Sequence, residues 1–241
     1  MNRQSNLYTV IYSVVLVLIV GVVLSVVYQA LRPKQEENIA NDTKRQILAA
    51  ALIIPQSGEN VSDLYSNYIT NSYIVNEEGE QVENSINPFD VNVSLEVKKP
   101  AGERLLPVFV CSLESGDKYI IPVYGAGLWG PIWGYVAFDD NGDTIYGAYF
   151  AHQGETPGLG AEIEKPAFSS QFQGKDIFNN SGEFQSVRVV ENGQEPAEGA
   201  WVHAISGGPI TSQGVQRMLS NSLEPYTAFF KNLKQGKEVE K

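Results

Sequence analysis

The feature that most constrains this chain is an uncharged, strongly apolar run near its N-terminus. No charged residue occurs from position 4 to position 31, and positions 8–28 are predominantly apolar. That length matches the ~20 residues that a helix needs to cross ~30 Å of hydrocarbon, and tyrosines lie near both ends as interfacial aromatics do. The run is longer than the apolar part of a signal peptide, and no small-x-small cleavage site follows it. The sequence therefore predicts a retained transmembrane helix within residues 1–32.

The rest of the 241 residues is long enough for one domain of roughly 200 residues with its own core. The net charge of −11 disfavours nucleic acid as a partner, because an acidic surface repels phosphate backbones. The single cysteine, Cys111, lies in an apolar run and is predicted to be a small buried side chain. His152 and His203 lack the spacing of metal ligands, so we expect no metal site.

The basic residues around the apolar run bear on its orientation. Only Arg3 and the amino terminus precede the run, whereas Arg32, Lys34, Lys44 and Arg45 follow it. By the positive-inside rule this distribution weakly favours a cytoplasmic location for the domain that follows.

Beyond residue 32 the sequence predicts an α+β domain with a curved, mostly antiparallel sheet and flanking helices. A connecting helix (33–52) and a polar wrapping segment with short strands at 72–75 and 91–97 make up residues 33–100. The main domain spans 101–241, with strands predicted at 105–111, 118–124, 133–138, 144–150, 185–190 and 200–205. Residues 139–143 contain an Asn-Gly pair typical of a hairpin turn, and they lack the spacing of the alternative, a calcium loop.

The segment 206–215 (SGGPITSQGV) links the last predicted strand to a C-terminal helix over residues 213–231, which Pro225 is expected to kink or divide. Its candidates for ligand contact are Ser206, Gly207, Gly208, Thr211 and Ser212, with Thr211 or Ser212 also predicted to cap the helix. A glycine turn that runs into a helix N-terminus presents N–H groups that attract phosphate. An ordinary helix start is the alternative.

Two further glycine-rich turns suggest a ligand. In the segment 152–160 (HQGETPGLG), Glu155, Thr156, Gly158 and Leu159 precede a predicted helix at 162–172. In the segment 125–134 (GAGLWGPIWG), Leu128 and Trp129 could form an apolar or stacking wall. Each turn also has a purely structural interpretation. Lys175 could pair with a phosphate, although a solvated lysine is the more common case.

These three segments, in this order behind one N-terminal span, resemble the C subunits of the Na⁺-translocating NADH:quinone reductases, which are relatives of the G subunit of the Rnf electron-transport complex. The resemblance covers nearly the whole chain. Residues 127–134 (GLWGPIWG) and 154–160 (GETPGLG) look like the two signature turns of the family, and residues 206–208 align with the start of its flavin-attachment motif. The tryptophan-rich turn favours the quinone reductase over the Rnf complex.

The resemblance implies an electron-transfer subunit in a bacterial inner-membrane complex that pumps sodium. Its partners would be the other subunits, the membrane and a flavin transferase that uses FAD. FMN would be joined through its phosphate to a threonine hydroxyl, and the soluble domain would face the periplasm, contrary to the charge distribution. The flavin ring is expected against Leu128, Trp129 and Leu159. No catalytic side chain is expected, because the flavin performs the redox chemistry.

The sequence departs from the family motif, Ser-Gly-Ala-Thr-x-Thr-Ser, at the usual acceptor position. Pro209 stands there and has no hydroxyl, and His203 stands where the family often has Asp. Thr211 is therefore predicted as the acceptor, in an exposed turn that a transferase can reach. The alternatives are attachment at Ser206 or Ser212, a non-covalent flavin, and a flavin-free, membrane-anchored assembly subunit.

Overall fold

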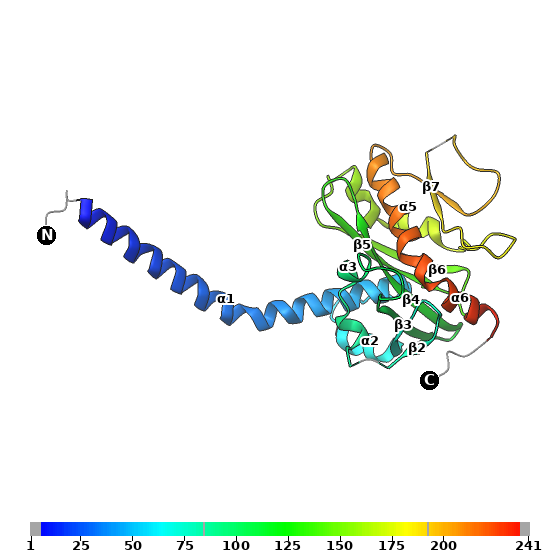
Figure 1. The fold of residues 1–241 in the computed structure, drawn as a ribbon, viewed down its shortest axis with the longest axis horizontal. Coiled ribbons are helices and arrows are strands. Elements are labelled where there is room, and N and C mark those ends of the chain that lie inside the picture. The colour runs from blue at the N-terminus through cyan, green and yellow to red at the C-terminus, as the bar shows by residue number, and fades with distance from the viewer. Residues whose placement is uncertain (1–5, 84, 192, 237–241) are drawn as a thin grey trace. The chain divides into compact units, whose positions relative to one another are not determined.

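The computed structural model describes residues 6–83, 85–191 and 193–236 of the chain (Figure 1). The chain divides between Thr43 and Lys44 into two compact units, and every described strand belongs to the second. Arg3 and most of the charged tail predicted at residues 234–241 lie outside the described residues.

One continuous helix, α1 (Asn6–Ala50), covers both the predicted membrane span and the helix predicted behind it. Among the described helices, α1 alone is long and apolar enough to cross a membrane by length and composition. Pro33 lies inside the helix, directly after the apolar run, where it removes one backbone hydrogen bond. At the same place Arg32 and Glu36 form an exposed ion pair of 2.7 Å. The prediction of an N-terminal apolar helix is confirmed.

The second unit is built on an open, six-stranded antiparallel sheet in the order β2-β1-β3-β4-β5-β6. Its strands are β1 (Ile69–Val75), β2 (Gln81–Val82), β3 (Leu106–Leu113), β4 (Gly116–Ala126), β5 (Pro131–Phe138) and β6 (Ile145–His152). A separate pair, β7 (Arg188–Val190) and β8 (Trp201–His203), runs parallel. The α+β class and the antiparallel sheet predicted from the sequence are confirmed.

Both faces of the sheet are buried, which explains why its central strands are apolar at consecutive positions. Val108 and Val110 of β3 belong to one core, whereas Phe109 and Cys111 belong to the other. The larger core lies under α5 (Pro209–Leu223), η4 (Glu224–Tyr226) and α6 (Thr227–Lys234). As predicted, Pro225 divides the C-terminal helix, because it lies in the 3₁₀ turn η4 between α5 and α6.

The smaller core lies under the last turns of α1. Ile47 and Ala50 are fully buried there, against Phe109 and Cys111 of the sheet. A Cβ atom on Gly147 of β6 would lie only 2.4 Å from the carbonyl oxygen of Ala50, so this close packing requires glycine. The indole N–H of Trp133 also donates to Oε1 of Gln46 at 3.0 Å.

The segment between α1 and β3 differs from its prediction. The strand predicted at 91–97 is wrong: η1 (Pro88–Asp90) and α3 (Val93–Glu96) form two short helical turns there. The Glu96 carboxylate stabilises this geometry by accepting the Leu105 N–H at 2.9 Å and pairing with Lys99 at 2.8 Å. The segment also does more than wrap the domain, because α2 (Val61–Tyr68) leads into β1 and β2 of the main sheet.

The continuous helix predicted at 162–172 is also wrong. Three short elements replace it, namely η2 (Gly160–Glu164), α4 (Pro166–Ser169) and η3 (Ser170–Phe172). Pro166 explains the first break, because proline has no N–H to donate and forces Lys165 into an extended conformation. Phe168 and Phe172 still reach the core, where they pack against each other and against Phe150.

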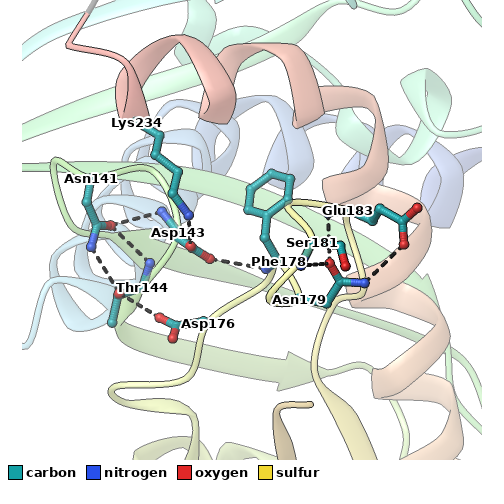
Figure 2. Close-up of polar contacts among 9 residues, drawn as sticks. All are labelled: Asn141, Asp143, Thr144, Asp176, Phe178, Asn179, Ser181, Glu183 and Lys234. Carbon is teal, nitrogen blue, oxygen red and sulfur yellow. Dashed lines mark hydrogen bonds and ion pairs between the residues drawn. The ribbon is translucent and has the colours of Figure 1, made fainter. Parts of the chain in front are cut away.

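The turn at 139–143 is a hairpin turn, as predicted, and polar contacts tie it to neighbouring segments (Figure 2). The Asn141 side chain accepts the N–H groups of Asp143 and Thr144 at 2.9 and 3.0 Å. The Asp143 carboxylate accepts the Phe178 N–H at 3.1 Å and pairs with Lys234 of α6. These contacts commit the Asp143 carboxylate to the fold, whereas a calcium loop would direct it to a cation.

We predict that Cys111 is inert in the folded protein. Its side chain is fully buried, and burial, with a smaller contribution from Asp117, raises its pKa to about 11. At about pH 8 this pKa lowers the thiolate fraction roughly 100-fold relative to a free cysteine. A thiol reagent should therefore label the detergent-solubilised chain only after denaturant is added. Rapid labelling of the native chain would contradict the burial of this strand face.

Candidate functional site

Three glycine-rich turns meet beside the ends of the central strands. The first, residues 127–130, joins β4 to β5 in a tight hairpin, in which the Gly127 N–H donates to the Gly130 carbonyl at 2.8 Å. The second, residues 153–159, leads from β6 into η2. The third, residues 204–208, leads from β8 into α5. The structure thus brings together the three segments that the sequence singled out.

A single buried carboxylate, that of Glu155 in the second turn, joins the first turn to the start of α5, directly after the third turn. Glu155 is only 4% exposed. Its Oε1 accepts the backbone N–H of Trp129 at 2.9 Å, and its Oε2 accepts the hydroxyl of Thr211 at 2.5 Å. Its own N–H donates to Nδ1 of His152 at 3.1 Å. Glu155 was expected to contact a cofactor, but in this structure its carboxylate holds the protein's own turns together.

Two of the glycines make room for this carboxylate. A Cβ atom on Gly127 would lie 2.4 Å from Oε1 of Glu155, and one on Gly160 would lie 2.3 Å from Oε2. Gly160 would also bring its Cβ within 2.6 Å of the Thr211 hydroxyl oxygen. All three distances are far below a van der Waals contact. At these two positions, glycine allows close packing of protein on protein, whereas the sequence suggested close approach to a ligand.

Helix α5 begins four residues earlier than predicted. Gly208 is its N-cap residue and Pro209 its first helical residue, a position where proline's fixed φ suits the helix. The predicted capping by Thr211 or Ser212 is wrong, because both lie within the first turn and are 1% exposed. Ser212 instead accepts the Ile205 N–H on its hydroxyl at 3.0 Å. The expectation that Thr211 lies in an exposed turn is therefore also wrong.

Ser206 differs from these two hydroxyl-bearing residues. It is exposed and lies in the turn that the Gly208 N–H closes by donating to the Ile205 carbonyl at 3.1 Å. Gly207 follows with φ of +75°, a conformation that glycine adopts at no steric cost. The turn lies against Leu159, since a Cβ on Gly207 would come within 2.7 Å of Cδ2 of that residue.

An exposed apolar rim surrounds the buried carboxylate. We define the rim as Leu128, Trp129, Leu159 and Ile210, with exposed fractions of 48%, 68%, 43% and 49%. Each rim residue makes contact with Glu155 or is next in sequence to a residue that approaches Glu155. The sequence identified the first three and missed Ile210, because Ile210 was predicted to lie in the turn before a helix that begins at residue 213. The rim is a suitable surface for a planar aromatic ring.

Two other predicted site residues lie beside the rim, and one does not. Thr156 and Gly158 are exposed in the second turn, next to Leu159. Lys175 instead extends over the Trp201 ring at 5.6 Å and lines a separate polar cavity of about 430 Å³. Its contacts therefore lie outside the three turns.

The electrostatics of the three turns are unusual for a phosphate site. Residues 125–134, 152–160 and 206–215 contain no lysine or arginine, and Glu155 adds a buried carboxylate. The apolar rim could accept a planar ring, but these turns supply no cationic side chain for a phosphate attached to it. Within these turns, only backbone N–H groups or a covalent bond could hold a phosphate.

Comparison with known proteins supports a flavin site. Residues 127–224 match the FMN-binding domain family, and this range includes the three turns. The chain is 32% identical over 230 residues to the C subunit of the Na(+)-translocating NADH-quinone reductase of Vibrio anguillarum, and the alignment covers 89% of each chain. It is also 32% identical over 256 residues to the same subunit of Yersinia pestis, with 98% of this chain and 96% of that relative covered.

Solved structures agree with these matches. The crystal structure of the C subunit of this reductase from Parabacteroides distasonis is 48% identical and superposes with a TM-score of 0.77, over 83% of this chain and 96% of that one. The structure of NqrC from Shewanella oneidensis is 28% identical, with a TM-score of 0.68, over 81% of this chain and 98% of that one.

We predict that Gly160→Ala destabilises the domain by about 2 kcal/mol, because the added Cβ would displace the Glu155 carboxylate. The melting temperature followed by tryptophan fluorescence should fall by roughly 4–8 °C. Gly154→Ala in the same turn is the matched control, since its Cβ would meet nothing closer than 3.9 Å. Equal effects of the two substitutions would contradict the assigned role of Glu155.

Proposed function

The chain belongs to the family of C subunits of the Na⁺-translocating NADH-quinone reductases, and we propose that it is the FMN-carrying electron-transfer subunit of such a complex. The observation that carries this proposal is the match of residues 127–224 to the FMN-binding domain, since this range includes the apolar rim and the Glu155 carboxylate beneath it. The subunit would act as one part of an oxidoreductase complex.

In this proposal the flavin supplies the redox chemistry, and the chain binds, orients and shields it. Leu128, Trp129, Leu159 and Ile210 would cover the ring and exclude water from it. Glu155 keeps the turns that carry these side chains in a fixed arrangement. Its buried negative charge would also oppose added negative charge on the ring, which favours a low reduction potential.

The phosphate would lie near the segment 206–212, joined to one of its hydroxyls. The threonine linkage predicted from the family resemblance stays a prediction. At Thr211 such an ester would require the 2.5 Å bond to Glu155 to break and the first turn of α5 to open, because this hydroxyl is buried.

Membership of this family also supports a proposal for where the chain is located and which proteins it contacts. We propose a single-pass protein of the bacterial inner membrane, anchored by α1, with the domain in the periplasm, where a flavin transferase could reach it. Other subunits of the reductase would exchange electrons with its flavin. The relatives described above are subunits of NADH-quinone reductases, which favours that complex over the Rnf-type alternative.

One observation favours a second candidate function. Pro209 at the first position of α5 is exposed and carries no hydroxyl. A flavin-free, membrane-anchored assembly subunit would tolerate this residue. Chain produced with a flavin transferase separates the two functions: a yellow protein with the visible spectrum of oxidised flavin supports the carrier, and a colourless protein supports the assembly subunit.

For the yellow protein we predict that Leu128→Ala raises the flavin midpoint potential. Removing part of the rim admits water, which stabilises the negative charge of the reduced flavin. The expected rise is on the order of 20 mV, or about 1 kcal/mol for a two-electron couple. Leu95→Ala is the matched control, because Leu95 is a similarly exposed leucine in α3, at 56%. Equal potentials for the wild type and Leu128→Ala would contradict the assigned ring site.

We predict that the domain is reached from the periplasm. Ile54 is 79% exposed, so Ile54→Cys should react with a membrane-impermeant maleimide in intact spheroplasts. The wild-type chain is the control, because its only cysteine, Cys111, is buried. Labelling that occurs only after lysis would place the domain in the cytoplasm, as the charge distribution suggested.

A further inference from the structure

The structure singles out one hydroxyl at the mouth of the candidate site. We infer that Ser206 is the residue of this chain that forms the phosphoester with FMN, an inference that rests on the proposed flavin-carrying function. Three observations support it: the engagement of the competing hydroxyls, the exposure of Ser206 beside the apolar rim, and the lack of a cation in the three turns to hold a free phosphate.

The other hydroxyls of the segment are committed to the fold. Thr211 donates to Glu155 at 2.5 Å, and Ser212 accepts the Ile205 N–H at 3.0 Å. Each is 1% exposed. An ester on Thr211 would leave the buried Glu155 without one of its donors, and an ester on Ser212 would leave the Ile205 N–H without its acceptor. Either modification would also place a charged phosphate on a side chain that is almost fully buried.

Ser206 has none of these constraints. It is exposed, and its hydroxyl has no hydrogen-bond partner among the described residues. Gly207 and Gly208 follow it, so the segment can adapt to the active site of a transferase. Pro209 then starts α5, so Ser206 lies outside the helix, in the turn that precedes it.

The position of Ser206 also suits the ring site. The Ser206–Gly207 turn lies against Leu159, one of the four rim residues. A flavin tethered at Ser206 could therefore lie over Leu159 and the neighbouring rim side chains. Because the three turns contain no lysine or arginine, a covalent tether would replace the ionic contacts that usually retain a free phosphate.

Thr156 is the exposed hydroxyl that competes with Ser206. It lies in the second turn and is followed directly by Pro157, which restricts its backbone. The Thr156 carbonyl also accepts the N–H groups of Leu159 and Ala161 at 3.1 and 3.2 Å, so hydrogen bonds fix the backbone that follows Thr156. Its secondary hydroxyl is more crowded than the primary hydroxyl of serine. These differences favour Ser206.

The proposed modification is a phosphoryl transfer to the Ser206 hydroxyl. The Ser206 hydroxyl oxygen attacks the FMN phosphorus of FAD in the transferase, and a new P–O bond forms. The pyrophosphate P–O bond to the AMP half breaks and AMP leaves, while the hydroxyl proton passes to solvent. No oxidant or reductant is consumed.

The test uses the full chain in detergent, produced together with a flavin transferase. Trypsin should release residues 189–217, and we expect this peptide to carry one FMN group, localised to Ser206 by fragmentation. Ser206→Ala should reduce the flavinylated fraction to background. Ser57→Ala removes an exposed serine that is distant in sequence from Ser206, and it should leave the flavinylated fraction unchanged.

Several outcomes would overturn the assignment. An adduct on Thr211, on Ser212 or, in the peptide that contains it, on Thr156 would move the site. A yellow protein with unmodified peptides would mean a non-covalent flavin, and would leave the proposed function intact. A colourless wild type would overturn both the assignment and the flavin-carrying function. Pro209→Thr, produced in parallel, would then show whether the transferase accepts this domain at all.

Discussion

The candidate site depends on one interaction, the acceptance of two protein donors by the Glu155 carboxylate. A buried carboxylate is costly unless its oxygens are satisfied, and here the Trp129 N–H and the Thr211 hydroxyl satisfy one oxygen each. Glycines at 127 and 160 leave the space that this arrangement needs. The exposed apolar rim is thus carried by turns that a polar contact, rather than a hydrophobic one, fixes in place.

The larger elements could be predicted from the sequence, because each depends on a long run of apolar, β-branched or aromatic residues. The apolar run of α1 and the strand runs from Leu106 to His152 are of this kind. The short elements could not be predicted in the same way. At residues 91–97, alternating valines suggested a strand, but the Glu96 contacts with Leu105 and Lys99 favour a helical turn. The contact between Glu96 and Leu105 joins residues nine positions apart, which no local pattern relates.

The candidate site likewise has parts that the sequence predicts and parts that it does not. The three turns and most of the rim could be found from glycine and aromatic residues close together in the sequence. The burial of Thr211 could not, because it follows from a hydroxyl donor meeting a carboxylate 56 positions away. The earlier start of α5 was likewise hidden, since Pro209 suits either a turn or the first residue of a helix. Only the assembled fold distinguishes an accessible hydroxyl from a structural one.

The last turns of α1 have a consequence for how the chain is made. Ile47, Leu48 and Ala50 are fully buried, yet ribosomes synthesise them before any strand of the sheet that covers them. Until β3 to β6 follow, only the partly buried side chains of Ile53, Tyr65, Tyr68, Ile69 and Phe89 can pack against this apolar surface. During that interval the nascent chain needs another cover for it, such as the lipid interface or a chaperone. A chain stalled before β6 would therefore be a preferred target for quality-control proteases.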